Sequence, residues 1–177
     1  MKERTEILIS GFGGQGIVRL GQIIGLAAIK QQYRVTMLKS HGTEQRGGYV
    51  RAQVIVSREP IDSPIVEDPD YFCAFSTPAY RRHVDMVSQG VIFYDPSSTE
   101  VDEEKVKKIT HYSVAARDIA IEKLGQAIYT NSVMLGAMAR KMEIFGKEIL
   151  LAAMLDVVPK FKEENARAFE AGYQLIK

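Results

Sequence analysis

Short apolar runs alternate with glycine- and proline-rich segments along the first part of the chain. Ile7-Leu8-Ile9 has the pattern of a buried strand. After a cluster of glycines, apolar or small residues return at the spacing of one helix face, namely Ile17, Leu20, Gly21, Ile24 and Ala28. The start of the chain therefore predicts a strand, a tight turn and a helix.

Further short apolar runs predict more strands. They cover residues 34–38, 49–57, 71–76, 91–95 and 109–112. The strand 49–57 follows 34–38 with too little chain between them for a helical crossover, because parallel neighbours need a long connection. We therefore expect an antiparallel or edge arrangement for this strand.

Helical signals lie between and after these strands. Thr77-Pro78 is typical of an N-cap and first helical residue, and Gly125 of the end of a helix over 115–124. From Asn131 onward, apolar residues repeat at helical spacing. Strands with helices first and a helical tail afterwards predict an α/β fold with a Rossmann-like, three-layer, mostly parallel sheet and a C-terminal helical layer. The length favours one domain over residues 1–177.

Composition and charge exclude several function classes. The formal net charge of +1 provides no basic excess for binding nucleic acid. No apolar run has the length of a membrane span and the N-terminus lacks a signal-peptide pattern, so we expect a cytoplasmic protein without membrane contact. The single cysteine, Cys73, lies in an apolar strand pattern; we expect an inert buried thiol that cannot ligate an iron–sulfur cluster by itself.

The glycine cluster after the first strand has the spacing G-x-G-x-x-G, with Gly11, Gly13 and Gly16 at its three positions. Between a strand and a helix, this pattern gives a tight turn and free N–H groups at the helix N-terminus, which suit an anion such as phosphate. Alternatively, the glycines only let the helix pack tightly on its sheet. The candidate cofactor-binding residues here are Gly11, Gly13, Gly14, Gln15 and Gly16.

Two further positions bear on the ligand. A nicotinamide-dinucleotide binder has an acidic residue after its second strand, where this chain has Lys39-Ser40, and this difference argues against simple NAD binding. Asp95 ends a strand at the edge where open α/β sheets bind ligands; it is equally placed to cap the turn that follows.

The loop from His41 to Gly48 (HGTEQRGG) joins two predicted strands and carries several hydrogen-bonding groups. Arg46, followed by Gly47 and Gly48, is suited to present its guanidinium and adjacent N–H groups to a phosphate or carboxylate. Glu44 is a candidate for the same site, or for an ion pair that makes the loop purely structural.

No catalytic constellation is apparent in the sequence. His41, His83 and His111 are scattered and have no metal-ligand spacing, so we assign no catalytic and no metal-binding residue. We expect His83 on a helix surface and His111 in a structural role. A chain with a ligand-binding loop but no evident chemistry is typical of a subunit of a larger enzyme.

Taken together, these segments resemble the gamma subunit of 2-oxoacid:ferredoxin oxidoreductases, a unit that is also a domain of single-chain pyruvate:ferredoxin oxidoreductases. The similar segments are the glycine cluster 11–17, the loop 41–48, the strand 51–57, Asp62-Ser63-Pro64, Pro69-Asp70, 90–95, Asn131 with 135–137, Asn165-Ala166 and 171–173. The glycine turn, Glu-x-Arg-Gly-Gly and Ser-Pro in this order make the resemblance specific.

The resemblance implies a reaction in which a 2-oxoacid, coenzyme A (CoA) and oxidised ferredoxin give an acyl-CoA, carbon dioxide and reduced ferredoxin. It implies that thiamine diphosphate, Mg and iron–sulfur clusters belong to partner subunits (alpha, beta and possibly delta), and that this chain helps to form the CoA site and to assemble the complex. CoA is a substrate of the complex; 2-oxoglutarate or a related 2-oxoacid is the expected second substrate.

Two alternatives remain open from the sequence. His41 and Thr43 depart from the family's usual loop, and the form His-Gly with Gln-Arg-Gly-Gly is also similar to the beta subunit of indolepyruvate:ferredoxin oxidoreductases. A different class of function is a stand-alone nucleotide- or CoA-binding module.

Overall fold

The computed structural model describes residues 3–41 and 48–176. The strands are β1 (Arg4–Phe12), β2 (Arg34–His41), β3 (Tyr49–Ser57), β4 (Tyr71–Ala74), β5 (Val91–Tyr94) and β6 (Thr110–Ser113). The helices are α1 (Ile17–Lys30), α2 (Thr77–His83), α3 (Glu103–Val106), α4 (Ala116–Leu124), α5 (Thr130–Lys141), α6 (Lys147–Val157) and α7 (Lys162–Leu175), with 3-10 turns η1 (Val84–Met86) and η2 (Ala127–Tyr129).

The strands form one sheet in the order β2-β3-β1-β4-β5-β6. β1, β4, β5 and β6 run parallel, whereas β3 is antiparallel to both β1 and β2. The expected antiparallel strand is therefore confirmed, and β2 rather than β3 occupies the edge. From Ala52 to Ser57, β3 is buried, because it lies inside the sheet with both faces covered.

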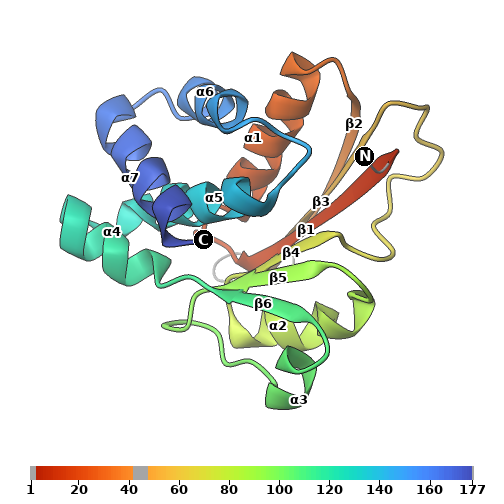
Figure 1. Ribbon diagram of the computed structural model, residues 1–177, viewed down its shortest axis with the longest axis horizontal. Helices are drawn as coiled ribbons and strands as arrows, with labels where there is room; N and C mark the ends of the chain where they lie inside the picture. The colour runs from red at the N-terminus through yellow and green to blue at the C-terminus, as the bar shows by residue number, and fades with distance from the viewer. Residues whose placement is uncertain (1–2, 42–47, 177) are drawn as a thin grey trace.

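The sheet lies between two helical layers (Figure 1). On one face, α1 and the C-terminal helices α5, α6 and α7 cover a large apolar cluster that includes Ile7, Ile9, Val54 and Phe169. On the other face, α2 packs on a smaller cluster around Phe72. The predicted α/β fold with a mostly parallel sheet and a C-terminal helical layer is confirmed. Within the described residues, no helix is both long and apolar enough to cross a membrane.

The C-terminal helices pack at very short range. A Cβ atom added to Gly136 on α5 would lie 1.9 Å from the Phe169 carbonyl oxygen on α7, and one added to Gly172 on α7 would lie 1.8 Å from the Val133 carbonyl oxygen on α5. The two glycines therefore allow the two helix backbones to approach each other directly.

Helix ends follow the expected chemistry, with shifts of a residue. α4 ends at Gly125, which has a φ of 76°, as predicted. α2 begins one residue earlier than expected: Ser76, not Thr77, is the N-cap, and its hydroxyl accepts a hydrogen bond of 3.3 Å from the Ala79 N–H.

Candidate functional site

The glycine turn between β1 and α1 is held by the side chain of Gln15. Its Oε1 accepts a hydrogen bond from the Phe12 N–H (2.6 Å), and its Nε2 donates to the Phe75 carbonyl (2.9 Å). Gly11 is required by this packing, because a Cβ there would lie 2.4 Å from Gln15 Oε1. Gly11 and Gln15 therefore shape the turn, and the side-chain amide of Gln15 is engaged within the protein.

The other three glycines place backbone rather than side chains at the turn. Gly14 and Gly16 have φ values of 93° and 75°, in the left-handed region that favours glycine. The Gly13 N–H donates to the Gly48 carbonyl (2.9 Å), which joins the glycine turn to the end of the β2–β3 loop. A Cβ added to Gly14 would have no atom within 4 Å, so Gly14 leaves the approach to the first turn of α1 open, whereas a Cβ added to Gly16 would lie 1.9 Å from Asn131 Nδ2.

The N-terminus of α1 has no side-chain cap and no acidic residue in its first turn. The first hydrogen bond of the helix runs from the Leu20 N–H to the Gly16 carbonyl (3.0 Å), so the N–H groups that precede Leu20 have no partner within the helix. These groups, together with the helix dipole, favour an anion at this end of α1.

This end of α1 opens into a cleft of about 780 Å³ at the carboxyl edge of the parallel strands. Gly13 and Gly14 line it together with Arg19, Arg117 and Asn131. Both arginine side chains are exposed, and neither has an ion pair within the described parts of the chain. The cleft therefore combines backbone N–H groups with two free guanidinium groups, a combination suited to phosphates.

Asp95 also borders the cleft, but its carboxylate is used by the protein. It is buried, and its oxygens accept hydrogen bonds from the Ser97 N–H (2.9 Å) and the Arg117 N–H (2.8 Å). Of the two roles left open by the sequence, the geometry favours the cap: Asp95 fixes the turn after β5 and the start of α4.

The predicted loop residues are only partly placed. Glu44, Arg46 and Gly47 lie outside the described residues. Gly48 is buried, and its carbonyl contacts Gly13 as described above. The hairpin β2–β3 thus returns the end of this loop to the carboxyl end of β1, where Phe12 pairs with Tyr49.

Three hydrogen-bonded side chains, Ser10, Tyr49 and His83 of α2, form a buried polar group that was not predicted from the sequence. His83 was expected at the surface, but it is only 3% exposed; its Nε2 accepts the Tyr49 hydroxyl proton, and that hydroxyl accepts one from Ser10 Oγ (2.8 Å). Burial, assisted by the positive charges of Arg51 and Arg82, lowers the pKa of His83 to about 4. The signal was present in the helix spacing, because His83 is four residues after the buried Ala79.

The remaining candidate groups are structural. His111 contacts the Tyr80 hydroxyl through Nε2 (2.9 Å) and the Ile109 carbonyl through Nδ1 (2.7 Å), and burial lowers its pKa. Cys73 is fully buried, which raises the pKa of its thiol, and nearby Asp95 acts in the same direction. Within the described residues, no three His, Cys, Asp or Glu side chains are grouped to hold a metal ion.

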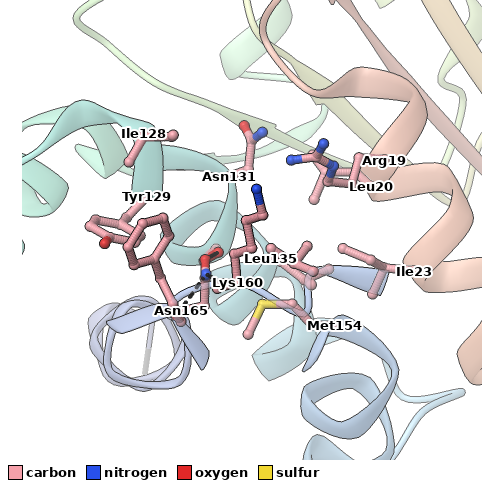
Figure 2. Close-up of a pocket in the computed structure, with 13 residues that line it drawn as sticks. Arg19, Leu20, Ile23, Ile128, Tyr129, Asn131, Leu135, Met154, Lys160 and Asn165 are labelled. Atoms are coloured by element: carbon pink, nitrogen blue, oxygen red, sulfur yellow. Dashed lines mark hydrogen bonds between the residues drawn. The ribbon is translucent and has the colours of Figure 1, made fainter. Parts of the chain in front are cut away.

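A smaller, largely apolar pocket of about 160 Å³ adjoins the cleft (Figure 2). Leu20 and Ile23 of α1, Leu135 of α5 and Met154 of α6 form its buried walls. Arg19, Ile128 and Asn131 border both the pocket and the cleft.

Comparison with known proteins assigns the fold and its family. The 2-oxoglutarate synthase subunit KorC of Methanocaldococcus jannaschii is 39% identical over 180 residues, covering 100% of this chain and 96% of that protein. The indolepyruvate oxidoreductase subunit IorB of Thermococcus kodakarensis is 27% identical over 198 residues, covering 100% and 98%.

Solved structures agree with these relatives. The 2-oxoglutarate:ferredoxin oxidoreductase from Magnetococcus marinus, solved with 2-oxoglutarate, coenzyme A and succinyl-CoA bound, matches with a TM-score of 0.88 at 26% identity. The match covers 99% of this chain and 31% of that longer chain. The gamma subunit of a keto/oxoacid ferredoxin oxidoreductase from Geobacter sulfurreducens matches over 98% of this chain and 96% of that one, with a TM-score of 0.81 at 28% identity.

The family model described as pyruvate ferredoxin/flavodoxin oxidoreductase matches residues 6–175, from the first strand to the last helix. This match covers the glycine turn, the cleft and the helical layer together. The chain therefore belongs to the pyruvate ferredoxin/flavodoxin oxidoreductase family, as a gamma subunit of a 2-oxoacid:ferredoxin oxidoreductase.

Proposed function

We propose that this chain serves in a cytoplasmic, CoA-dependent complex that oxidises 2-oxoglutarate, with residues 1–177 acting as one gamma-type domain. In this reaction the 2-oxoacid loses carbon dioxide, its acyl group passes to the CoA thiol, and two electrons reduce ferredoxin. The full-length similarity to KorC supports 2-oxoglutarate as the substrate more strongly than the lower identity to IorB supports indolepyruvate.

The groups that perform decarboxylation and electron transfer are proposed to reside in alpha, beta and possibly delta subunits. Iron–sulfur clusters need several cysteine thiolates, whereas this chain has one cysteine, buried within β4. The residues of this chain therefore do not fit a cluster. Thiamine diphosphate and its Mg are likewise assigned to the partners, and the role proposed for this chain is to bind and orient CoA.

The CoA proposal rests on the uncapped N-terminus of α1, which opens to a cleft with two arginines that have no ion pair among the described residues. CoA has several phosphate groups, which backbone N–H donors and guanidinium groups bind well. In this proposal, Gly14 keeps the approach to the N–H groups open and Gly16 makes room for Asn131 beside them, while Arg19 and Arg117 contact phosphate oxygens. Glu44, Arg46, Gly47 and Gly48 are proposed to complete the site or the contact with the neighbouring subunit.

The complex itself provides the first test. It is purified without oxygen through a tag on this chain, and reduction of a viologen dye is followed with 2-oxoglutarate, pyruvate, 2-oxoisovalerate and indolepyruvate. Dependence on both CoA and 2-oxoglutarate is expected. Preference for indolepyruvate would assign the chain to the alternative complex, and recovery of the chain without partners would favour a stand-alone binding module.

The CoA site is tested with Arg117→Gln in the assembled complex. Loss of one guanidinium–phosphate contact at an exposed site is expected to raise the KM for CoA about three- to tenfold, with the KM for 2-oxoglutarate unchanged. Arg167→Gln is the matched control, because Arg167 is exposed on α7 and does not line the cleft. Equal KM values for CoA in both variants would contradict this placement.

Arg46→Ala extends the same test to the loop. Either weaker apparent affinity for CoA or weaker assembly with the partner subunits is expected. If Arg46→Ala leaves both properties unchanged, the proposed role of the loop is wrong.

A further inference from the structure

Two polar side chains inside the apolar pocket beside the cleft, Ser132 and Asn165, are hydrogen-bonded within the protein. Ser132 Oγ donates to Asn165 Oδ1 (2.6 Å), and Asn165 Nδ2 donates to the carbonyls of Lys160 (3.1 Å) and Phe161 (2.9 Å). The other inner walls are aliphatic and thioether side chains and Tyr129. An occupant therefore needs no polar atom on the part that enters the pocket.

The mouth of the pocket has the opposite character. Figure 2 shows the ends of Arg19 and Lys160, which come from α1 and the α6–α7 connection, directed toward the same space, with Asn131 of α5 beside it. Neither Arg19 nor Lys160 has an ion pair in the part of the chain that the structure describes. No Asp or Glu is among the described residues that line the pocket, so its mouth carries two unbalanced positive charges.

The rim of the pocket is apolar and partly strained. Ile128 is 70% exposed and Phe161 is 61% exposed, the two highest values among the large apolar side chains of the described residues. Phe161 also has a φ of 54°, which costs energy for a residue other than glycine. The Asn165 side chain donates hydrogen bonds to the carbonyls of Lys160 and Phe161. These hydrogen bonds hold the backbone of Phe161 in this conformation.

We propose that this pocket binds a small monocarboxylate with a compact, branched or aromatic apolar body. The body fills the apolar interior, whose volume is close to that of cavities that bind benzene. The carboxylate meets the positive charges of Arg19 and Lys160, which supply charge-assisted hydrogen bonds, with the Asn131 side chain beside them. This site adjoins the proposed CoA cleft, which takes phosphates, and shares Arg19 and Asn131 with it, whereas Lys160 lines the pocket alone.

The chemical class is tested by titrating the full-length, isotopically labelled chain and following its amide NMR signals. Three probes separate the carboxylate from the apolar group. 3-Methylbutanoate has both, 3-methylbutan-1-amine has the same branched alkyl group with a positive charge, and acetate has the carboxylate without the branched alkyl group. Saturable shifts at residues lining the pocket are expected for 3-methylbutanoate, with affinity at least tenfold weaker for the other two. Equal binding of the amine would overturn the proposal.

Two variants test the placement. Lys160→Gln removes a charge at the mouth without touching the cleft, and about tenfold weaker binding of 3-methylbutanoate is expected. Lys123→Gln is the charge-matched control, because Lys123 is exposed on α4 and does not line the pocket. Ile128→Ala is expected to weaken binding, with Ile121→Ala as its control on exposed surface of α4.

Binding that is unaffected by Lys160→Gln would overturn the proposal. So would an absence of saturable binding while partner subunits protect the amides around Ile128 and Phe161 from hydrogen exchange, since that result assigns the pocket to a protein side chain. CoA-dependent turnover of the complex is measured separately, so its failure would count against the proposed function alone.

Discussion

The hydrogen-bonded side chains of Ser10, Tyr49 and His83 keep the imidazole of His83 neutral inside the protein. The imidazole accepts a hydrogen bond at Nε2 and contacts Phe72, and its burial and the positive charges of Arg51 and Arg82 lower its pKa. The guanidinium carbon of Arg82 lies 4.5 Å from the centre of the Tyr49 ring, a cation–π contact that also restrains this side chain. The neutral His83 therefore supports Tyr49, the residue with which β3 begins.

The pH dependence of stability follows from this environment. The unfolded chain protonates His83 near its ordinary pKa of 6.5, whereas the folded protein does so near 4, so acid favours unfolding between these values. The free energy of unfolding is expected to fall as the pH is lowered from about 6.5 toward 4. In His83→Gln the slope is expected to decrease by up to one proton, measured by urea unfolding at a series of pH values.

His111→Gln is the matched comparison, because burial also lowers the pKa of His111 but no arginine assists it. A smaller change of slope is expected for that variant. An identical pH dependence in the wild type and in His83→Gln would show that His83 is not held neutral in the folded chain.

At the scale of single residues, the sequence reveals backbone requirements better than side-chain partners. Gly16 was identifiable from the G-x-G-x-x-G spacing between a strand and a helix, and its φ of 75° lies in the left-handed region that favours glycine. The engagement of Gln15 with Phe75, and of Asp95 with Arg117, depends on chain segments that meet only after folding. No local pattern contains this information, so the sequence does not show that these two side chains hold other parts of the protein in place.

At the scale of elements, two glycines that both lie inside helices differ in whether the structure leaves room for a side chain. Gly25 lies in the interior of α1, where an added Cβ would find its nearest neighbour, Val35 Cγ2, at 3.9 Å, an ordinary contact distance. Gly136 also lies within a helix, but its added Cβ would meet the backbone of α7. The difference is set by the neighbouring helix and not by the helix that contains the glycine.

This contrast predicts stability changes of opposite sign. Gly25→Ala is expected to stabilise the protein by about 0.5–1 kcal/mol through helix propensity. Gly136→Ala is expected to destabilise it by about 3 kcal/mol or more, because α5 and α7 must separate. Urea unfolding of the full chain measures both changes, and a stabilising Gly136→Ala would show that the helices do not approach each other this closely.

Element types were readable from the sequence because each depends on local periodicity. The boundaries were less certain, as at Ser76, because neighbouring residues compete for the same capping role. The pairing of β3 followed from the short connection alone. Its interior place in the sheet did not, since strand order depends on contacts between distant parts of the chain.

At the scale of the whole molecule, the chain contributes shape and positive charge to a complex whose redox groups are proposed to lie elsewhere. Cys73 of β4 has no exposed surface and belongs to the large apolar cluster between the sheet and the layer of α1, α5, α6 and α7. Cys73→Ala is therefore expected to leave the iron content of the purified complex unchanged, at a stability cost of about 1 kcal/mol for the lost sulfur. Iron analysis per complex measures this, and a loss of iron would contradict the assignment of all clusters to partner subunits.

The strand order has a consequence for synthesis on the ribosome. β1 is made first but lies in the middle of the sheet, between β3 and β4. Its hydrogen bonds to β3 can form once residue 57 has emerged, whereas its other edge stays unpaired until residues 71–74 follow. During that interval the nascent chain presents an apolar strand edge that can pair with other chains. The apolar face that α5, α6 and α7 cover remains open longer still, so the protein reaches a protected surface only when its last helix has left the ribosome.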